Sequence, residues 1–352
     1  SLSYDVRIGS SEDDQLQITQ INNKTFQVLM ANGDSKSFKL SEDGVIEVGS
    51  GGEPLSLPIN VQNSSVSLYP LSSFTAILFL VAILLQIFTL IDDAYGVRPA
   101  KRLLGQSIGA LAVIIFGNIY ITSLQISILG ISLQLGFWGI PFTVVAVVGI
   151  INAFNMIDGI NGLCAGLALV AIGALQVASG FNVSNYSLVI AMGSIIGFLF
   201  YNLGFLGTKR RVFLGDNGST FLGFLVAWTC INYSQGEANL IMPVTCLWIV
   251  AIPLLDCIGV MVYRVMRGIL PFDAGRDHIH HKLQAYLGSS FKALTFLCGL
   301  GVSLASIGII IEKTTQSSEI SLLIFLGVAA CYYFGSNYIS TKILTNNTTA
   351  DV

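Results

Sequence analysis

Nine apolar stretches, each about 20 residues long and so able to cross a bilayer as a helix, constrain this chain more than any other feature of its sequence. Lipid offers a chain no hydrogen-bond partners, so the backbone must satisfy its own polar groups as a helix or closed barrel. Hydrophobic residues make up 53% of the chain and charged residues 11%. We therefore predict an all-α polytopic membrane protein with helices at residues 73–91, 104–124, 138–155, 162–179, 187–206, 218–234, 241–262, 293–311 and 320–339.

The first 70 residues have a different character. Apolar and polar residues alternate in the short runs 16–21, 26–30 and 44–48, and Asn-Gly and Gly-Gly pairs separate these runs. This pattern is typical of β-strands joined by tight turns. We expect three parts: a β-rich polar segment at 1–70 outside the cytoplasm, a multi-span domain at 71–342, and a cytoplasmic tail at 343–352.

The basic residues predict how the spans are oriented. Lys and Arg follow the first, fifth and seventh apolar runs, whereas residues 125–137, 180–186 and 235–240 contain neither. Basic connections stay on the cytoplasmic side of a membrane. The odd-numbered connections should therefore face the cytoplasm. With nine spans, residues 1–70 lie outside and the C-terminus lies inside.

All three histidines of the chain fall within residues 278–281, in a polar segment between two apolar runs. The same segment carries Arg264, Arg267, Arg276 and Lys282. Imidazole transfers protons or binds anions near neutral pH, and guanidinium groups grip phosphate oxygens two at a time. The segment therefore favours a phosphate-binding site. A zinc site is an alternative, but the basic neighbours would repel a cation.

Acidic and amide residues also gather at predicted span ends. Asp92-Asp93 ends the first span, Asn152, Asn155 and Asp158 end the third, and Asp216 follows the fifth. On the predicted topology all of these lie at the cytoplasmic surface. Each has a plainer explanation: a solvated helix end for the acid pair, interhelical hydrogen bonds for the asparagines, and a turn or N-cap for Asp216.

Together these groups indicate one kind of chemistry. Carboxylates without nearby cysteines suit Mg²⁺ or Mn²⁺ better than zinc, and Mg²⁺ usually links one or two carboxylates to substrate phosphates. We infer metal-assisted phosphoryl transfer at the membrane surface, with a lipid as one substrate. A transporter is the competing class, but it would spread polar residues across the bilayer depth. Asp256, inside the seventh span, is the one clear residue of that kind, and pairing with a neighbouring helix explains it equally well.

Four motifs in order resemble those of the polyprenyl-phosphate N-acetylhexosamine-1-phosphate transferases. They are Leu90-Ile91-Asp92-Asp93, the run from Asn152 to Ile160, the run from Phe213 to Thr220, and Arg276-Asp277-His278-Ile279-His280-His281. The resemblance covers residues 75–340. It implies transfer of a sugar-1-phosphate from a UDP-sugar to undecaprenyl phosphate with Mg²⁺ or Mn²⁺, releasing UMP and starting O-antigen or another envelope polysaccharide. The His-Ile-His-His form is similar to the N-acetylglucosamine branch, and the branch that uses UDP-MurNAc-pentapeptide is the lesser alternative.

The resemblance also implies site residues, partners and a location. The protein would act in the bacterial inner membrane with its site facing the cytoplasm, would bind no nucleic acid, and could form a homodimer. The residues are Asp92, Asp93, Asp158 and His278 for catalysis, Asn152, Asn155, Asn161, Lys101, Arg276, His280 and His281 for substrate binding, and Asp216 with Asp93 for the metal.

Two departures from the family pattern bear on activity. Asn161 stands three residues after Asp158, where the family usually has a second acid, so one charge is lost. The family also usually has two further spans before the Asp-Asp helix. We therefore expect that the chain is truncated upstream, and an inactive relic is a further alternative.

Overall fold

The protein divides into two units, residues 1–70 and 71–352, which are described separately. The computed structural model describes residues 3–7, 15–22, 25–29, 35–40, 46–48, 73–128, 131–180, 186–236, 239–270, 275 and 277–350. The N-terminal unit is a five-stranded antiparallel sheet in sequential order. Its strands are β1 Ser3–Arg7, β2 Gln15–Asn22, β3 Thr25–Leu29, β4 Ser35–Leu40 and β5 Ile46–Val48.

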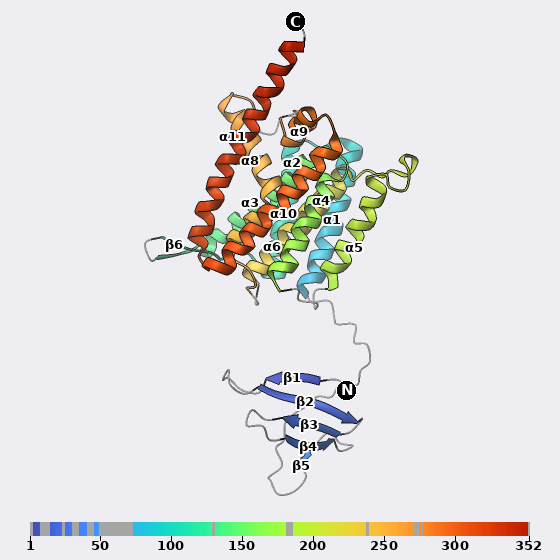
Figure 1. Ribbon diagram of the computed structural model, residues 1–352, viewed down its shortest axis with the longest axis vertical. Coiled ribbons are helices and arrows are strands. Elements are labelled where there is room, and N and C mark those ends of the chain that lie inside the picture. Colours follow the sequence, from blue (N-terminus) through green and yellow to red (C-terminus); the bar gives the residue numbers. More distant parts are fainter. Residues whose placement is uncertain are drawn as a thin grey trace. The chain divides into compact units, whose positions relative to one another are not determined.

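The second unit is a bundle of helices that run up and down beside one another (Figure 1). The short helix α9 lies at one end of the bundle, and a hairpin of β6 and β7 lies at the other. The elements are α1 Ser73–Tyr95, α2 Pro99–Gly117, β6 Ser123–Ile128, β7 Ile131–Gln134, η1 Gly136–Trp138, α3 Gly139–Ile157, α4 Leu163–Ala178, α5 Tyr186–Asn202, η2 Thr208–Arg210, α6 Gly215–Gln235, α7 Pro243–Ile249, α8 Ala251–Met266, α9 Ile279–Leu287, α10 Ser290–Thr315 and α11 Ser318–Ala350.

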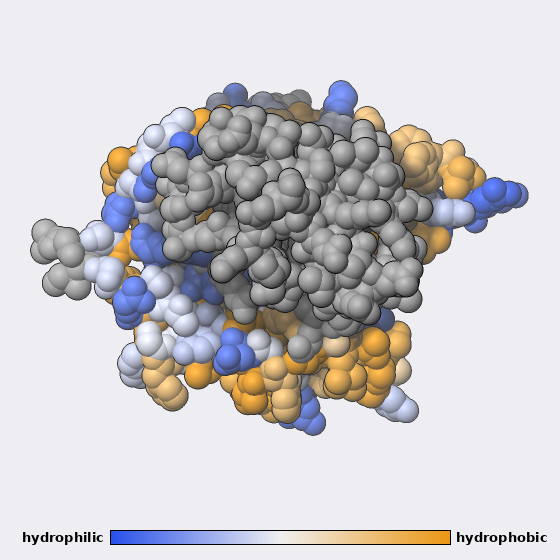
Figure 2. All heavy atoms as spheres, turned by 90° about the horizontal axis from the view of Figure 1, so that it is seen from below, coloured by the Kyte–Doolittle hydropathy of each residue, from blue (hydrophilic) through white to orange (hydrophobic). Residues whose placement is uncertain are grey.

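The bundle belongs in a membrane. Among the described residues, five helices are long and apolar enough to cross a bilayer, or six if the bent pair α7 and α8 forms one span. Large hydrophobic side chains cover the outside of the bundle, and Figure 2 shows them around its rim. Such extensive apolar surface suits lipid rather than water. The chain is therefore a multi-pass membrane protein, and the nine crossings stay a prediction.

Two predicted spans differ from the helices observed. The helix predicted at 104–124 begins at Pro99, a residue pre-organised for the first helical turn, and ends at Gly117, where Asn118 adopts a left-handed conformation. The span predicted at 241–262 is broken at Val250, where α7 and α8 meet at 82°. Hydrophobicity alone does not predict where a helix ends or bends, because the residues on both sides of the break are equally apolar.

Small residues allow the bundle to pack closely. A Cβ at Gly223 of α6 would lie 2.8 Å from the Cα of Ile151 on α3, so the backbones of the two helices approach each other closely here. A second close approach joins Gly308 of α10 to Trp248 of α7, whose indole N–H donates to Ser321 at 3.1 Å. Small residues at helix crossings are the usual means of packing in membranes. This packing fixes the helix ends that carry the polar residues.

Candidate active site

Asp92 is buried in the last turn of α1 and holds the following turn in place. Its Oδ1 accepts a hydrogen bond from the Val97 backbone N–H at 2.9 Å, and its Oδ2 pairs with the Arg102 Nε at 2.6 Å. The turn between α1 and α2 therefore folds around one carboxylate. The neighbouring Asp93 is exposed, so the two adjacent acids do not point at the same ligand.

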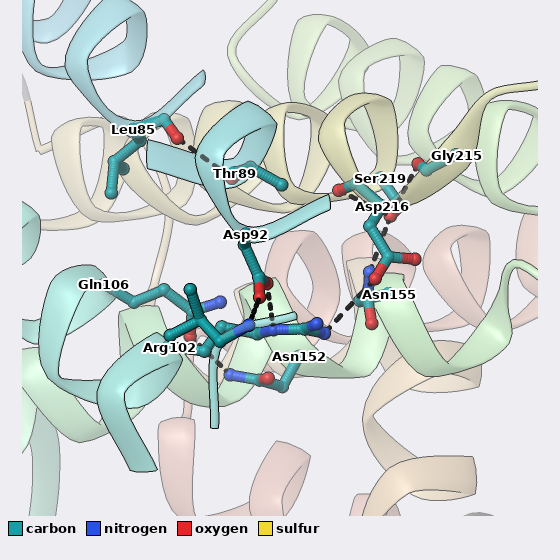
Figure 3. Close-up of polar contacts among 11 residues, drawn as sticks. Leu85, Thr89, Asp92, Arg102, Gln106, Asn152, Asn155, Gly215, Asp216 and Ser219 are labelled. Atoms are coloured by element: carbon teal, nitrogen blue, oxygen red, sulfur yellow. Dashed lines mark hydrogen bonds and ion pairs between the residues drawn. The ribbon is translucent and has the colours of Figure 1, made fainter. Parts of the chain in front are cut away.

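Arg102 joins α1 to α6 (Figure 3). While its Nε contacts Asp92, its Nη1 donates to the Asp216 Oδ2 at 3.2 Å. Asp216 lies in the first turn of α6, after Gly215 in a left-handed conformation. The helix dipole favours a carboxylate at that end. Arg102, which in the sequence is only one of several basic residues after the first apolar run, thus links two of the predicted acids, Asp92 and Asp216.

The amides of α3 tie it to the helices on either side (Figure 3). The Asn152 side chain donates to the Gln106 Oε1 on α2 at 2.7 Å. The Asn155 side chain donates to the Ser219 Oγ on α6 at 3.0 Å. Both contacts are interhelical hydrogen bonds, the plainer explanation for asparagines in a membrane helix. They also fix the height at which α3 ends.

A cavity opens where α3, α5, α6 and α10 end. Its volume is about 600 Å³, and both Asp158 and Asp216 line it. Burial, and then the charge of Asp216, raise the pKa of Asp158 to about 6. The remaining lining residues include Asn161, Asn202, Arg211, Phe213, Gln284, Ser290 and Phe291.

The histidine segment docks onto the same end of the bundle through Asp256 of α8. The Asp256 carboxylate accepts from the backbone N–H of Ile279 at 2.8 Å, and its other oxygen lies 2.8 Å from the His278 Nδ1. A carboxylate here caps the first turn of α9 and places the proton of His278 on Nδ1. The intramembrane acid therefore pairs with the histidine motif.

His280 is the most buried of the histidines and packs against the turn after α3. Its side chain is 1% exposed, and a Cβ on Gly159 would overlap its ring. Burial, and then the neighbouring His281, lower the pKa of His280 to about 4. In the described part of the chain neither ring nitrogen has a hydrogen-bond partner. The ring is therefore neutral at pH 7 and fixes α9 beside Asp158.

The structure gathers most of the predicted site residues but not all. Asp92, Asn152, Asn155, Asp158, Asp216, His278, His280 and the half-buried His281 lie at one end of the bundle, and Asn161 lines the cavity. Lys101 and Asp93 are exposed, and neither lines the cavity. Arg276 lies outside the described residues. The sequence did not single out Arg102 or Arg211, and it left Asp256 open between a functional role and pairing with a neighbouring helix, because a sequence shows charge but not which helices meet.

The donor set suits a hard divalent cation held jointly with a substrate. In the described residues, no group of three His, Cys, Asp or Glu side chains could hold a metal alone. Asp158 and Asp216, however, face one cavity and repel each other. A cation between them would relieve that repulsion, and Mg²⁺ usually needs only one or two carboxylates when phosphates complete its shell.

Comparisons with known proteins agree with this site. The model of Glycosyl transferase family 4 matches residues 75–234. The chain is 36% identical over 247 residues to the undecaprenyl-phosphate alpha-N-acetylglucosaminyl 1-phosphate transferase of Escherichia coli O157:H7, covering 69% of this chain and 67% of that protein. The protein of the same name from Haemophilus influenzae is 39% identical over 241 residues, covering 67% of each chain.

A third relative of that name, from Yersinia pestis, is 36% identical over 241 residues, which cover 67% of this chain and 66% of the relative. The chain thus spans about two thirds of the length of the curated relatives it matches. The matched region includes the ends of α1, α3 and α6, where the acids described above converge. This chain belongs to glycosyl transferase family 4, among the polyprenyl-phosphate sugar-1-phosphate transferases.

Proposed function

We propose that this chain transfers N-acetylglucosamine-1-phosphate from UDP-N-acetylglucosamine to undecaprenyl phosphate and releases UMP. The reaction would start a lipid-linked O-antigen or another envelope polysaccharide. One observation carries the proposal: Asp92, Asp158 and Asp216 come from three helices and meet at one end of a membrane bundle. A site there is open both to a soluble nucleotide and to a lipid phosphate. The names of the relatives support the choice of substrates.

The cavity suits the nucleotide sugar. Asp158 and Asp216 would hold Mg²⁺ or Mn²⁺, which when bound supplies charge neutralisation for the phosphates. Arg211 is the one basic side chain among the described residues that line the cavity, and Phe213 offers an exposed aromatic face. Amides at Asn161, Asn202 and Gln284 can donate and accept hydrogen bonds. This combination of charge, ring and amide fits a nucleoside diphosphate.

In the transfer, an oxygen of the lipid phosphate attacks the phosphorus next to the sugar. A new P–O bond forms, the bond to the UMP oxygen breaks, and UMP leaves with that electron pair. Asp256 holds the His278 Nδ1 and so fixes the orientation of the ring at this end of the bundle. Burial and the charge of Asp216 raise the pKa of Asp158 to about 6, and in its ionised form this carboxylate would hold the cation together with Asp216. Asp92 is buried and paired, so it positions Arg102 instead.

The site end of the bundle would face the cytoplasm of a bacterial inner membrane. The nine helical passes α1, α2, α3, α4, α5, α6, α7 with α8, α10 and α11 support nine crossings, although α4 and α5 are short. Basic residues follow α1, α5 and α8 at the site end, and 118–138 at the other end has none. The sheet of β1 to β5 would then lie outside the cytoplasm. Labelling engineered cysteines at Lys209 and Gln134 in intact cells tests this: only position 134 should react with an impermeant maleimide.

The activity is tested by UMP release from membranes that contain the full chain. UDP-N-acetylglucosamine and undecaprenyl phosphate together should give UMP in a Mg²⁺-dependent manner, and either substrate alone should not. Asp216→Asn should lower turnover at least 100-fold, because the site loses a metal-holding charge. If UMP is released from UDP-N-acetylgalactosamine or UDP-MurNAc-pentapeptide but not from UDP-N-acetylglucosamine, the chain belongs to another branch of the family. No UMP from any of these substrates would reject the enzyme and favour a transporter or a relic.

A further inference from the structure

Arg102 holds two acids that differ sharply in burial. Its Nε contacts the Asp92 Oδ2 at 2.6 Å, and the Asp92 side chain is 1% exposed. Its Nη1 contacts the Asp216 Oδ2 at 3.2 Å, and that side chain is 47% exposed. The contact with Asp92 is short and shielded from water, whereas the contact with Asp216 is longer and exposed to solvent. The two halves of this bridge are therefore unequal in strength.

The unequal burial decides which half can open. Breaking the Asp92 contact would leave a buried carboxylate with a hydrogen bond from Val97 N–H but no opposite charge, which is strongly unfavourable. Breaking the Asp216 contact costs little, because water can solvate both groups and exposed ion pairs contribute little stability. Arg102 can therefore stay anchored on Asp92 while its outer guanidinium nitrogen exchanges one acceptor for another.

The start of α2 is rich in basic residues. Arg98, Lys101 and Arg102 lie at or within its first turn, which holds no acidic residue, and Arg98 caps the helix without a side-chain hydrogen bond. The helix dipole adds further positive potential at this end. The acids Asp92, Asp93 and Asp216 match these bases in number, so it is the helix dipole that favours a further anion close to Arg102.

The surroundings indicate that this anion belongs to a lipid. Leu90 and Ile91, beside Asp92 on α1, are 56% and 47% exposed, and Leu104 on α2 is 60% exposed. Arg102 itself does not line the cavity that suits the nucleotide. The guanidinium thus lies between an apolar surface that faces lipid and the acid Asp216 of the cavity.

From this geometry we infer that Arg102 is an exchangeable clamp for the phosphate of the acceptor lipid. Without ligands its Nη1 holds Asp216. When Asp216 holds a divalent cation instead, Nη1 would be free to bind the lipid phosphate while Nε stays on Asp92. Metal and lipid phosphate should therefore strengthen each other's binding. This inference rests on the proposed function, but it concerns binding rather than turnover.

The clamp is tested by the coupling between Mn²⁺ and lipid phosphate in the purified full chain. Mn²⁺ affinity is measured by electron paramagnetic resonance in detergent, with undecaprenyl phosphate, with uncharged undecaprenol, or with neither. Undecaprenyl phosphate should tighten Mn²⁺ binding at least 5-fold in the unchanged protein, and undecaprenol should not. Arg102→Lys keeps the charge beside Asp92 but cannot bridge two groups, so the tightening should fall below 2-fold. Arg98→Gln, the matched control, removes one positive charge but leaves the Arg102 bridge intact, so undecaprenyl phosphate should still tighten Mn²⁺ binding at least 5-fold.

A second measurement leaves Arg102 in place. With EDTA present, Asp216→Asn should bind undecaprenyl phosphate at least 3-fold more tightly than the unchanged protein, because Nη1 has lost its acidic partner. Asp158→Asn also removes one negative charge from the cavity, but Asp158 is not the acid that pairs with Arg102. Its gain in affinity for undecaprenyl phosphate should therefore be less than half that of Asp216→Asn. Full coupling in Arg102→Lys, or equal effects of the two aspartate variants, would overturn the clamp.

These outcomes separate the clamp from the proposed activity. Coupling that depends on Arg102 in a chain that releases no UMP would support the clamp and reject the activity. UMP release with coupling unchanged in Arg102→Lys would support the activity and reject the clamp.

Discussion

Gly159→Ala tests whether the histidine segment truly docks on the turn after α3. An added Cβ would overlap the His280 Nε2 and would lie 2.6 Å from Cδ2 and 2.8 Å from Cε1. Gly159 does not adopt a left-handed backbone, so the penalty is steric rather than conformational. The ring cannot easily yield, because His280 is 1% exposed and its ring centre lies 4.1 Å from that of His281.

The expected cost follows from this lack of space. Overpacking a filled site costs about 1–3 kcal/mol, and three ring atoms meet the new methyl group here, so we expect about 3 kcal/mol. For a chain of 352 residues that corresponds to a fall of about 4 °C in the thermal midpoint. Differential scanning fluorimetry in detergent measures the midpoint, and UMP release measures the loss of turnover as α9 is displaced.

Two further variants make the result specific. Gly149→Ala, on α3 with nothing within 4 Å of the added Cβ, should leave the midpoint unchanged or slightly higher. In a His280→Ala background, Gly159→Ala should cost little further stability, because the ring that it would overlap is gone. If Gly159→Ala melts and turns over like the unchanged protein, the segment does not pack where the structure has it.

Two predictions concern buried acids near the same turn. Asp256→Asn should lower the free energy of unfolding by about 1–3 kcal/mol, because an amide cannot accept from both Ile279 N–H and His278 Nδ1–H. Thermal midpoints of this variant and of Asp256→Leu measure the loss. An unchanged midpoint in Asp256→Asn would contradict the role of Asp256 as the cap of α9. Asp158 has a pKa raised from 3.8 to about 6, so the metal-free native protein binds more protons than the unfolded chain in that window. Its stability should therefore fall as pH rises from 4 to 6, by at most about 3 kcal/mol and by less after solvent screening. Asp158→Asn should flatten that fall, and an identical pH profile in the variant would contradict the assignment.

The sequence predicted the site's composition better than its contacts. Asp92, Asp158, Asp216 and His278 each stand at the end of an apolar run, so counting runs was enough to expect them on one side. Their partners could not be found this way. Arg102 lies between Asp92 and Asp216 only because α1, α2 and α6 pack together, which no local pattern encodes.

The fold, too, was predictable only where it depends on local sequence. Apolar character located the helices, yet it missed the break at Val250, where the residues on both sides are equally apolar. The hairpin of β6 and β7 was missed although polar and apolar residues alternate along it, because the segment was read only as a connection between two spans. It also gave no sign of α9, since Asp256 supplies its cap from a distant helix. Long-range capping and bends arise from tertiary packing, and a linear pattern records neither.

The account's central claim is that the sugar moves together with its own phosphate. UDP-N-acetylglucosamine labelled with ³²P at the phosphate next to the sugar distinguishes this from plain sugar transfer. The account predicts that the label passes into the undecaprenyl lipid in the same amount as UMP appears, and that Asp216→Asn abolishes both. Label that stays on UDP while sugar reaches the lipid would contradict it.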